Sequence, residues 1–164
     1  MFKGTSASAG IGIGKAVIVE EAELVITRNE VADAEAEIQR FKGALEKTIA
    51  ATQKMADDLA SRVGEKEAEI MQGHMMLLSD PMLTGEIENS VKNDKVNCEF
   101  AIENVCNMYA DMFASMGDEL MQQRATDMRD IKVRMQRTLM GLESVDVSLL
   151  PKGSILVAKD LTPS

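Results

Sequence analysis

The stretch EIMQGHMMLLSDP, residues 69 to 81, contains the only histidine of this 164-residue chain. An imidazole can serve as an acid–base group, a nucleophile or a metal ligand, because it changes charge near neutral pH. A nucleophilic site also needs a Ser or Cys for the imidazole to activate and a third group to orient it. The neighbours of His74 are Gly73 and Met75, so the sequence favours a packed or partner-facing histidine over a catalytic one.

The other metal-binding residue types do not stand at ligand spacing. Helical di-iron sites pair a Glu with a His three residues later, and Glu69 does not have that spacing from His74. Cys98 and Cys106 form neither a C-x-x-C pair nor a disulfide framework. We therefore expect no metal site in this chain, and we expect the two thiols to stay reduced in a cytoplasm.

The glycine-rich run GIGIGKA, residues 10 to 16, is the remaining candidate for chemistry. A phosphate-binding loop needs a Gly five residues before its Gly-Lys pair and a Ser or Thr after it. Those places hold Ala9 and Ala16. A dinucleotide fingerprint would open a helix, whereas this run leads into the apolar segment KAVIVE. A tight turn or bulge before a strand is the favoured interpretation.

Composition limits both the core and the partners. Hydrophobic residues make up 45% of the chain and aromatic residues only 3%, with 13 methionines, which suits packed helices. The net charge of −9 argues against nucleic acid. An acidic surface complements a basic protein partner, but it also suits a surface that only keeps the chain soluble. No apolar run approaches the length of a membrane span, and the N-terminus has no secretion signal pattern.

Apolar periodicity predicts helices from about residue 31 to 142. We expect a long helix that is interrupted at Gly64, and a shorter one from Glu65 to Leu78. Asp80 is placed to cap the next helix, with a proline at the first helical position, and Asn97 is placed to cap the one after. A fifth helix repeats the pattern. The connections are short, which predicts an antiparallel helical bundle.

Strand patterns stand at both ends of the chain. The segment from Lys15 to Glu20 is predicted as a strand buried on both faces or nearly so, and Glu23 to Arg28 as a second extended piece. Ile155 to Ala158 is predicted as a strand after a turn. The bundle is therefore expected to be inserted into an α/β domain of which this chain holds only part, because two or three strands alone would leave open edges.

The surroundings of His74 leave two interpretations open. Ile70, His74, Leu77 and Leu78 would share one helix face, with Met71 and Met75 beside it. That is more apolar surface than a single amphipathic helix needs. Either the segment is buried on most sides, which composition favours, or part of it is an exposed strip where methionines adapt to a partner and acidic residues surround it.

Four motifs occur in the order and spacing that is typical of one known family. They are SASAGIGIGKA, GHMMLLSDP, RATDMRDI and ILVAKDLTPS. On these motifs the chain resembles the phosphoenolpyruvate-protein phosphotransferases, the enzyme I family of the bacterial sugar phosphotransferase system, over essentially all its length. The resemblance implies a mainly α fold. An antiparallel helical bundle at residues 30–142 would be inserted into an incomplete phosphohistidine α/β domain, represented by strands within 1–29 and 143–164.

The resemblance also implies a function. The family transfers phosphate from phosphoenolpyruvate through an enzyme histidine to the histidine-containing phosphocarrier protein, for sugar uptake. That histidine stands in a Gly-Gly-x-x-Ser-His-Thr motif, and this sequence stops at Ser164 before such a motif. We therefore expect a fragment that docks the carrier protein, has no catalytic residue or cofactor of its own and is inactive alone. Magnesium binding and homodimerisation would belong to a C-terminal domain of the cytoplasmic parent.

By motif position, the resemblance implies a set of residues that bind the carrier protein. They are Glu65, Ile70, His74, Met76, Leu77, Asp80 and Leu83, with Arg124 near them. His74 thus resembles a docking-face histidine of the family and not its phosphorylated one. Two alternatives remain: a non-catalytic helical scaffold or adaptor, and an enzyme that uses His74 itself as the phosphate acceptor.

Overall fold

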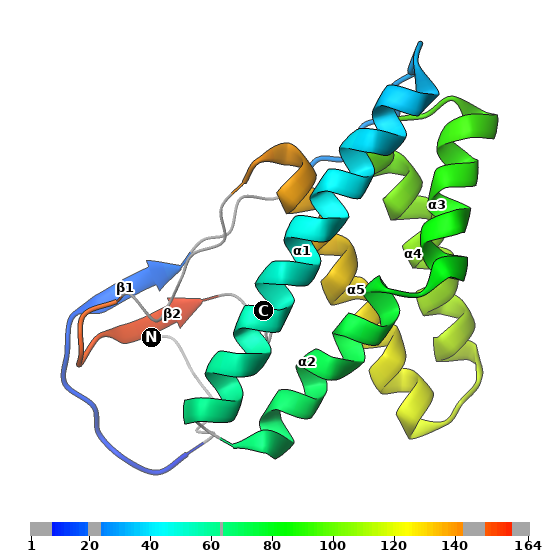
Figure 1. Cartoon of the computed structure of the whole chain (residues 1–164). Helices are drawn as coiled ribbons and strands as arrows, with labels where there is room; N and C mark the ends of the chain where they lie inside the picture. Colours follow the sequence, from blue (N-terminus) through cyan, green and yellow to red (C-terminus); the bar gives the residue numbers. More distant parts are fainter. Residues whose placement is uncertain (1–7, 20–23, 63, 143–149, 159–164) are drawn as a thin grey trace, which may run out of the picture. The chain divides into compact units, whose positions relative to one another are not determined.

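The computed structural model describes residues 8–19, 24–62, 64–142 and 150–158. These residues fall into two units, whose elements are labelled in Figure 1. One unit contains the strands β1 (Ala16–Val19) and β2 (Ile155–Ala158). The other contains the five helices that the structure describes, so the predicted mainly helical fold is confirmed. None of the described helices is long and apolar enough to cross a membrane.

The helical unit is an antiparallel bundle, as the short connections predicted. Its helices are α1 (Ala34–Arg62), α2 (Glu65–Leu78), α3 (Pro81–Asp94), α4 (Cys98–Ser115) and α5 (Glu119–Met140). In Figure 1, α1 and α4 run downward, whereas α2, α3 and α5 run upward. α1 has 29 residues and α2 and α3 have 14 each, so the two shorter helices together run back along the length of α1.

The restart between α2 and α3 follows the local chemistry that the sequence predicted. Asp80 has an extended backbone, and its Oδ1 accepts a hydrogen bond from the N–H of Met82 at 2.8 Å. Pro81 occupies the first helical position, where an N–H would have no partner within the helix. The chain therefore ends one helix and begins another without leaving the bundle.

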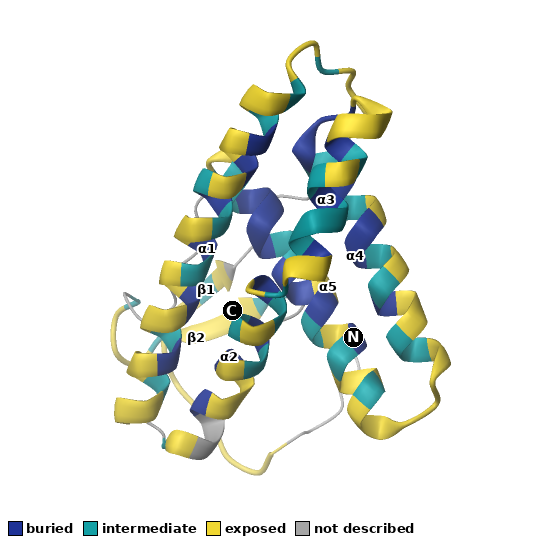
Figure 2. Ribbon diagram, turned by 45° about the vertical axis from the view of Figure 1, so that its right-hand side comes forward, coloured by how far each residue is buried: buried dark blue, intermediate teal, exposed yellow. Residues whose placement is uncertain are grey.

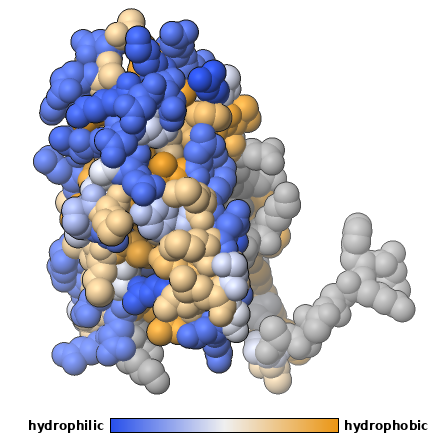
Figure 3. Space-filling model, turned by 90° about the vertical axis from the view of Figure 1, so that its right-hand side faces the viewer, coloured by the Kyte–Doolittle hydropathy of each residue, from blue (hydrophilic) through white to orange (hydrophobic). Residues whose placement is uncertain are grey.

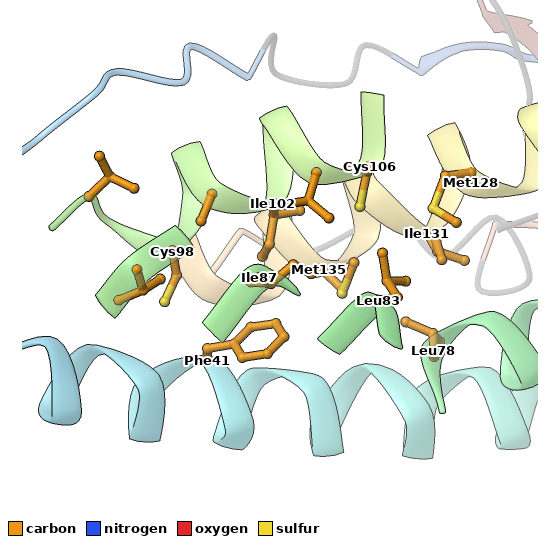
Figure 4. Packing of buried hydrophobic residues seen from close by; sticks show 14 of the residues in the cluster. Phe41, Leu78, Leu83, Ile87, Cys98, Ile102, Cys106, Met128, Ile131 and Met135 are labelled. Carbon is orange, nitrogen blue, oxygen red and sulfur yellow. The ribbon is translucent and has the colours of Figure 1, made fainter. Parts of the chain in front are cut away.

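The core lies between the helices and is built almost entirely from aliphatic and sulfur-containing side chains. Buried residues line the inward sides of the helices in Figure 2. Phe41 of α1 is 1% exposed and points toward Ile87 and Met135 in Figure 4. Other members of the cluster are Leu78, Leu83, Ile102, Cys106, Met128 and Ile131. Burial of this surface supplies most of the free energy that holds the bundle together.

The start of α4 is held by a residue of α1 and not by its own N-cap side chain. Asn97 occupies the predicted N-cap position, but its side chain makes no capping hydrogen bond. Instead, Oε1 of Glu37 accepts the hydrogen bond of the Cys98 N–H at 2.8 Å. The Asn97 side chain accepts the N–H of Asn29 and donates to Glu99. The prediction that Asn97 caps this helix was right in position and wrong in mechanism.

The two strands pair in parallel, with Ala16 opposite Ile155 and Val19 opposite Ala158. The predicted strand at the C-terminal end is confirmed residue for residue. The prediction that the first strand is buried on both faces was wrong for this chain, because Ile18 is 68% exposed. A two-stranded sheet has too few neighbours to cover its faces.

Two further expectations concern the segments beside the strands. The glycine-rich run precedes a strand and not a helix, which excludes the strand–loop–helix order of a nucleotide loop. A Cβ on Gly14 would overlap the carbonyl oxygen of Gly153, so a glycine is required there. The described part of the extended piece at residues 23–28 forms no strand, and only an isolated bridge joins Glu30 to Val96.

Candidate docking site

Six of the eight predicted docking residues are at least partly exposed, and they lie on α2, at the N-cap of α3 and near the start of α5. Met76 is 69% exposed and Ile70 is 48% exposed. Glu65 is also exposed, and Leu77, Asp80 and Arg124 are partly buried. We call these six residues the docking face: Glu65, Ile70, Met76, Leu77, Asp80 and Arg124.

The other two predicted docking residues lie inside the bundle. His74 and Leu83 are each 1% exposed, and Leu83 belongs to the main apolar cluster. A partner that docks on this structure would not contact either side chain. For His74, the core interpretation that composition favoured is therefore the one that the structure adopts.

The buried side of α2 is offset from the face that its sequence predicted. The buried residues are Ala68, Met71, His74 and Leu78, at helical steps of three and four. Ile70, which was expected to share the face of His74, points away from this stripe. α2 packs against both α1 and α5. Packing on these two neighbours buries Met71 in place of Ile70. Periodicity alone does not reveal which neighbouring helix lies where.

His74 connects α2 to α5 through two carboxylates. Its Nε2 lies 3.3 Å from Oδ1 of Asp127, and its Nδ1 lies 3.5 Å from Oδ2 of Asp130. The side chain is 1% exposed. Both ring nitrogens therefore face carboxylates, and the imidazole itself is enclosed, so an incoming phosphoryl group would be repelled and sterically excluded. This geometry argues against the alternative in which His74 is itself the phosphate acceptor.

Asp127 also pairs with Arg124 at the surface. Nη1 of Arg124 lies 3.7 Å from Oδ2 of Asp127, and the arginine side chain is 31% exposed. The guanidinium crosses α2 at Gly73, where an added Cβ would lie only 2.8 Å from Nη1. Sequence analysis identified Arg124 by its motif, but not the glycine against which it lies.

Exposed methionines also occur on α3 and α4. Met82 is 66% exposed, Met108 53% and Met112 44%. Figure 3 shows this side of the bundle, where apolar patches lie among polar residues. Acidic groups accompany them: burial, followed by the charges of Glu86 and Asp80, raises the pKa of Tyr109. Sequence analysis did not assign the α4 methionines to the surface, because their spacing is also that of a core stripe.

A hollow of about 350 Å³ at the other end of the bundle contains the most strongly bonded charges, which sequence analysis did not identify. Arg40 lies between Glu37 and Glu99, with closest distances of 2.6 Å and 2.8 Å. A hydrogen bond from Arg40 lowers the pKa of Glu37. Burial alone would raise the pKa of Glu99, but hydrogen bonds, chiefly from Arg40, lower it. Arg40 is hydrogen-bonded to both glutamates, and Glu37 accepts the Cys98 N–H, so this cluster secures the start of α4.

No cluster of metal ligands accompanies either region. Within the part of the chain that the structure describes, no three His, Cys, Asp or Glu residues lie close enough together to hold a metal ion.

Comparison with known proteins places these features in a family. A family model described as "PEP-utilising enzyme, N-terminal" matches residues 3–124. The phosphoenolpyruvate-protein phosphotransferase of Listeria monocytogenes is 40% identical over 163 residues, which are 99% of this chain and 28% of that protein. The corresponding protein of Bacillus subtilis is 38% identical over 163 residues, again 99% of this chain and 29% of that protein. The chain thus spans less than a third of these relatives.

Solved structures with the same fold include two from enzyme I proteins. An NMR solution structure of Enzyme I (nEIt) superposes with a TM-score of 0.91 at 36% identity, over 99% of this chain and 66% of that one. The N-terminal domain of the nitrogen Enzyme 1 gives a TM-score of 0.72 at 25% identity, over 91% of this chain and 61% of that one. The described fold thus matches the corresponding part of enzyme I N-terminal regions.

Proposed function

Because the chain belongs to the family of PEP-utilising enzyme N-terminal domains, we propose that its bundle docks the histidine-containing phosphocarrier protein within a phosphoenolpyruvate-protein phosphotransferase. In that enzyme, phosphate moves from phosphoenolpyruvate to an enzyme histidine and then to the carrier histidine. The observation that carries the proposal is the docking face. Ile70 and Met76 are exposed on α2, Glu65 is the first residue of that helix, and Asp80 follows its end.

The docking face has the composition that a transient interface needs. Its apolar centre, Ile70 and Met76 with Leu77, gives up water on contact, and the flexible methionine adapts to the partner's shape. Glu65 and Asp80 attract a basic partner and speed its association. A carrier must leave after each transfer, so we expect a dissociation constant of about 1 µM.

The task of this bundle in the reaction is positioning. Phosphoryl transfer depends chiefly on the alignment of donor, phosphorus and acceptor. The only histidine of the chain is buried between two aspartates, so the reacting enzyme histidine of the proposal belongs to another part of the parent. His74 and Leu83 support the docking face from beneath it. The described residues offer no ligand cluster for the magnesium ion that the family uses, and we assign no step to a metal here.

The remaining parts of the proposal concern the parent protein. Residues 1–29 and 143–164 would belong to its phosphohistidine α/β domain and residues 30–142 to the inserted bundle. The parent would form a homodimer through a C-terminal domain and work in the cytoplasm. Two buried, free cysteines are consistent with that compartment.

NMR titration tests the docking proposal directly. Unlabelled carrier protein is added to the ¹⁵N-labelled chain, and we expect amide shifts to concentrate between Met71 and Leu83 and around Arg124. The substitution Met76→Ala should weaken binding about fivefold, as expected for loss of one well-packed apolar contact. Met140→Ala, at a methionine that is 42% exposed and lines the hollow beside Arg40, is the matched control and should leave binding unchanged.

Charge variants separate steering from structure. Asp80 also caps α3, so Asp80→Asn is preferable to a lysine, because asparagine caps helices about as well as aspartate while removing the charge. Glu65→Gln with Asp80→Asn should lower the association rate and flatten its dependence on salt. An absence of amide shifts with the wild-type chain would instead favour the scaffold or adaptor alternative. Labelling of His74 after incubation with phosphoenolpyruvate and magnesium would contradict the positioning role.

A further inference from the structure

We propose that Gly73, His74 and Asp127 form a positioning device that holds the guanidinium of Arg124 in one orientation on the docking face. The inference rests on the proposed docking function and adds to it residues that act through Arg124. Two contacts between α2 and α5 and one within α5 carry it, and the carboxylate of Asp127 takes part in two of them.

The first contact is the passage of Arg124 over Gly73. A Cβ at this position would lie 2.8 Å from Nη1 of Arg124 and 3.9 Å from Oδ2 of Asp127. The first distance is shorter than a carbon–nitrogen contact tolerates, so any larger residue would force the guanidinium to shift from this position. Glycine lowers the stability of a helix interior, and α2 carries one at the point where the arginine crosses.

The second and third contacts divide the carboxylate of Asp127 between two partners. Its Oδ1 lies 3.3 Å from Nε2 of the buried His74, and its Oδ2 lies 3.7 Å from Nη1 of Arg124. His74 is enclosed in the bundle and cannot swing away, so it fixes the direction of the carboxylate. The carboxylate in turn directs the exposed arginine, which would otherwise sample many rotamers.

A fixed guanidinium does something that a mobile one does not. Its N–H donors form a planar fork that matches a carboxylate or a pair of carbonyl oxygens. Asp127 pairs with one nitrogen of Arg124, and the arginine side chain is 31% exposed, so a partner's oxygen atoms can reach it. On a docking face that otherwise carries acids, this orientation selects a basic partner that also presents an oxygen acceptor at one place. The arginine is thus a specificity element, and its ordering lowers the entropy lost on binding.

The substitution Gly73→Ala tests the device, because it should weaken binding without lowering stability. Alanine favours a helix, and the displaced atom is the end of a flexible side chain, so the bundle should unfold at an equal or higher urea concentration than wild type. Arg124 must move, and affinity for the carrier protein should fall about fivefold, as expected for one charged contact at an interface rim. Gly43→Ala is the matched control, since this helical glycine has open space around its missing Cβ.

Two further measurements distinguish positioning from a general structural effect. In an Arg124→Ala background, Gly73→Ala should cause no additional loss of affinity. In the free chain, ¹⁵N relaxation of the Arg124 Nε–H group should report a restrained side chain in wild type and a mobile one in Gly73→Ala. Asp127→Asn leaves the backbone unaltered and should also weaken binding and make the Arg124 side chain mobile. It serves as the second variant if alanine at position 73 prevents folding.

The inference is overturned if Gly73→Ala weakens binding equally with and without Arg124, or if it leaves affinity and side-chain mobility as in wild type. In both cases the wild-type chain still binds the carrier protein, so the proposed function survives. Failure of the wild-type chain to bind refutes the proposed function itself, together with the docking role of Arg124.

Discussion

Replacement of Arg40 by methionine should destabilise the bundle in a way that depends on pH. Arg40 donates two hydrogen bonds to each of two carboxylates, at 3.0 and 2.6 Å to Glu37 and at 2.8 and 2.8 Å to Glu99. The two glutamate side chains are only 13% and 14% exposed. Methionine keeps the length of the side chain and removes the charge, so two poorly hydrated carboxylates are left facing each other.

The size of the effect follows from exposure. Breaking a fully buried ion pair from one side costs about 3–5 kcal/mol, and an exposed pair contributes about 0–1 kcal/mol. The Arg40 side chain is 40% exposed, which places this site between these limits. We expect Arg40→Met to lower the free energy of unfolding by about 2 kcal/mol at pH 7.

The sign of the pH dependence follows from the two glutamates. Their pKa values lie below 4.5 in the folded chain, so their contribution is present above pH 4.5 and is lost as the pH falls through the lowered pKa. Wild type should therefore lose stability in acid. The difference between wild type and Arg40→Met should shrink below pH 4.5, since protonated glutamates no longer need the arginine.

Urea unfolding followed by circular dichroism at 222 nm measures this effect, because that signal comes from the helices. Lys42→Met is the control: Lys42 pairs with Glu88 at 3.3 Å, and the lysine is 46% exposed. We expect it to cost less than about 1 kcal/mol at any pH. Equal costs for the two variants at pH 7, or a cost for Arg40→Met that is the same at pH 7 and pH 4, would refute this account of the site.

Two other predictions concern the core. Phe41→Ala should lower the free energy of unfolding by about 4 kcal/mol in the same urea assay, because the ring is buried and its removal leaves a cavity; a cost below about 1 kcal/mol would mean that the core is not packed around it. The thiols of Cys98 and Cys106 should react with a thiol reagent only when the bundle unfolds, since burial raises both pKa values to about 12; rapid reaction of the native chain at pH 8 would contradict their enclosure.

The helices could be predicted from sequence because their ends depend on local chemistry. Asp80 with its following proline, the interruption at Gly64 and the short polar connections each act within a few residues. The strand Ile155–Ala158 is a similar case, where an apolar run follows a turn. Such signals do not depend on which helix lies beside which.

Features that depend on a distant neighbour were not predictable in the same way. Glu37 caps α4 from another helix, and no pattern near Asn97 reveals it. His74 and Leu83 are buried because α2 and α3 pack on several neighbours, whereas their motif suggested contact with a partner. From sequence alone, Gly73 is only a residue that destabilises a helix, and its contact with Arg124 becomes known only from the structure. The exposure of β1 depends on which strands accompany it and not on its own apolar residues.

The parallel pairing of β1 with β2 determines the order in which this chain assembles. A ribosome releases Ala16–Val19 long before Ile155–Ala158, so the first strand must wait unpaired while every helix is synthesised. Closing so long a loop is entropically unfavourable. A folded bundle removes most of that entropic cost, because it brings the start of α1 close to the end of α5. Nη1 of Arg40 lies 3.4 Å from the carbonyl oxygen of Leu139. We expect the helices to fold first and the strands to pair last, leaving an early β-edge that nascent-chain chaperones would have to shield.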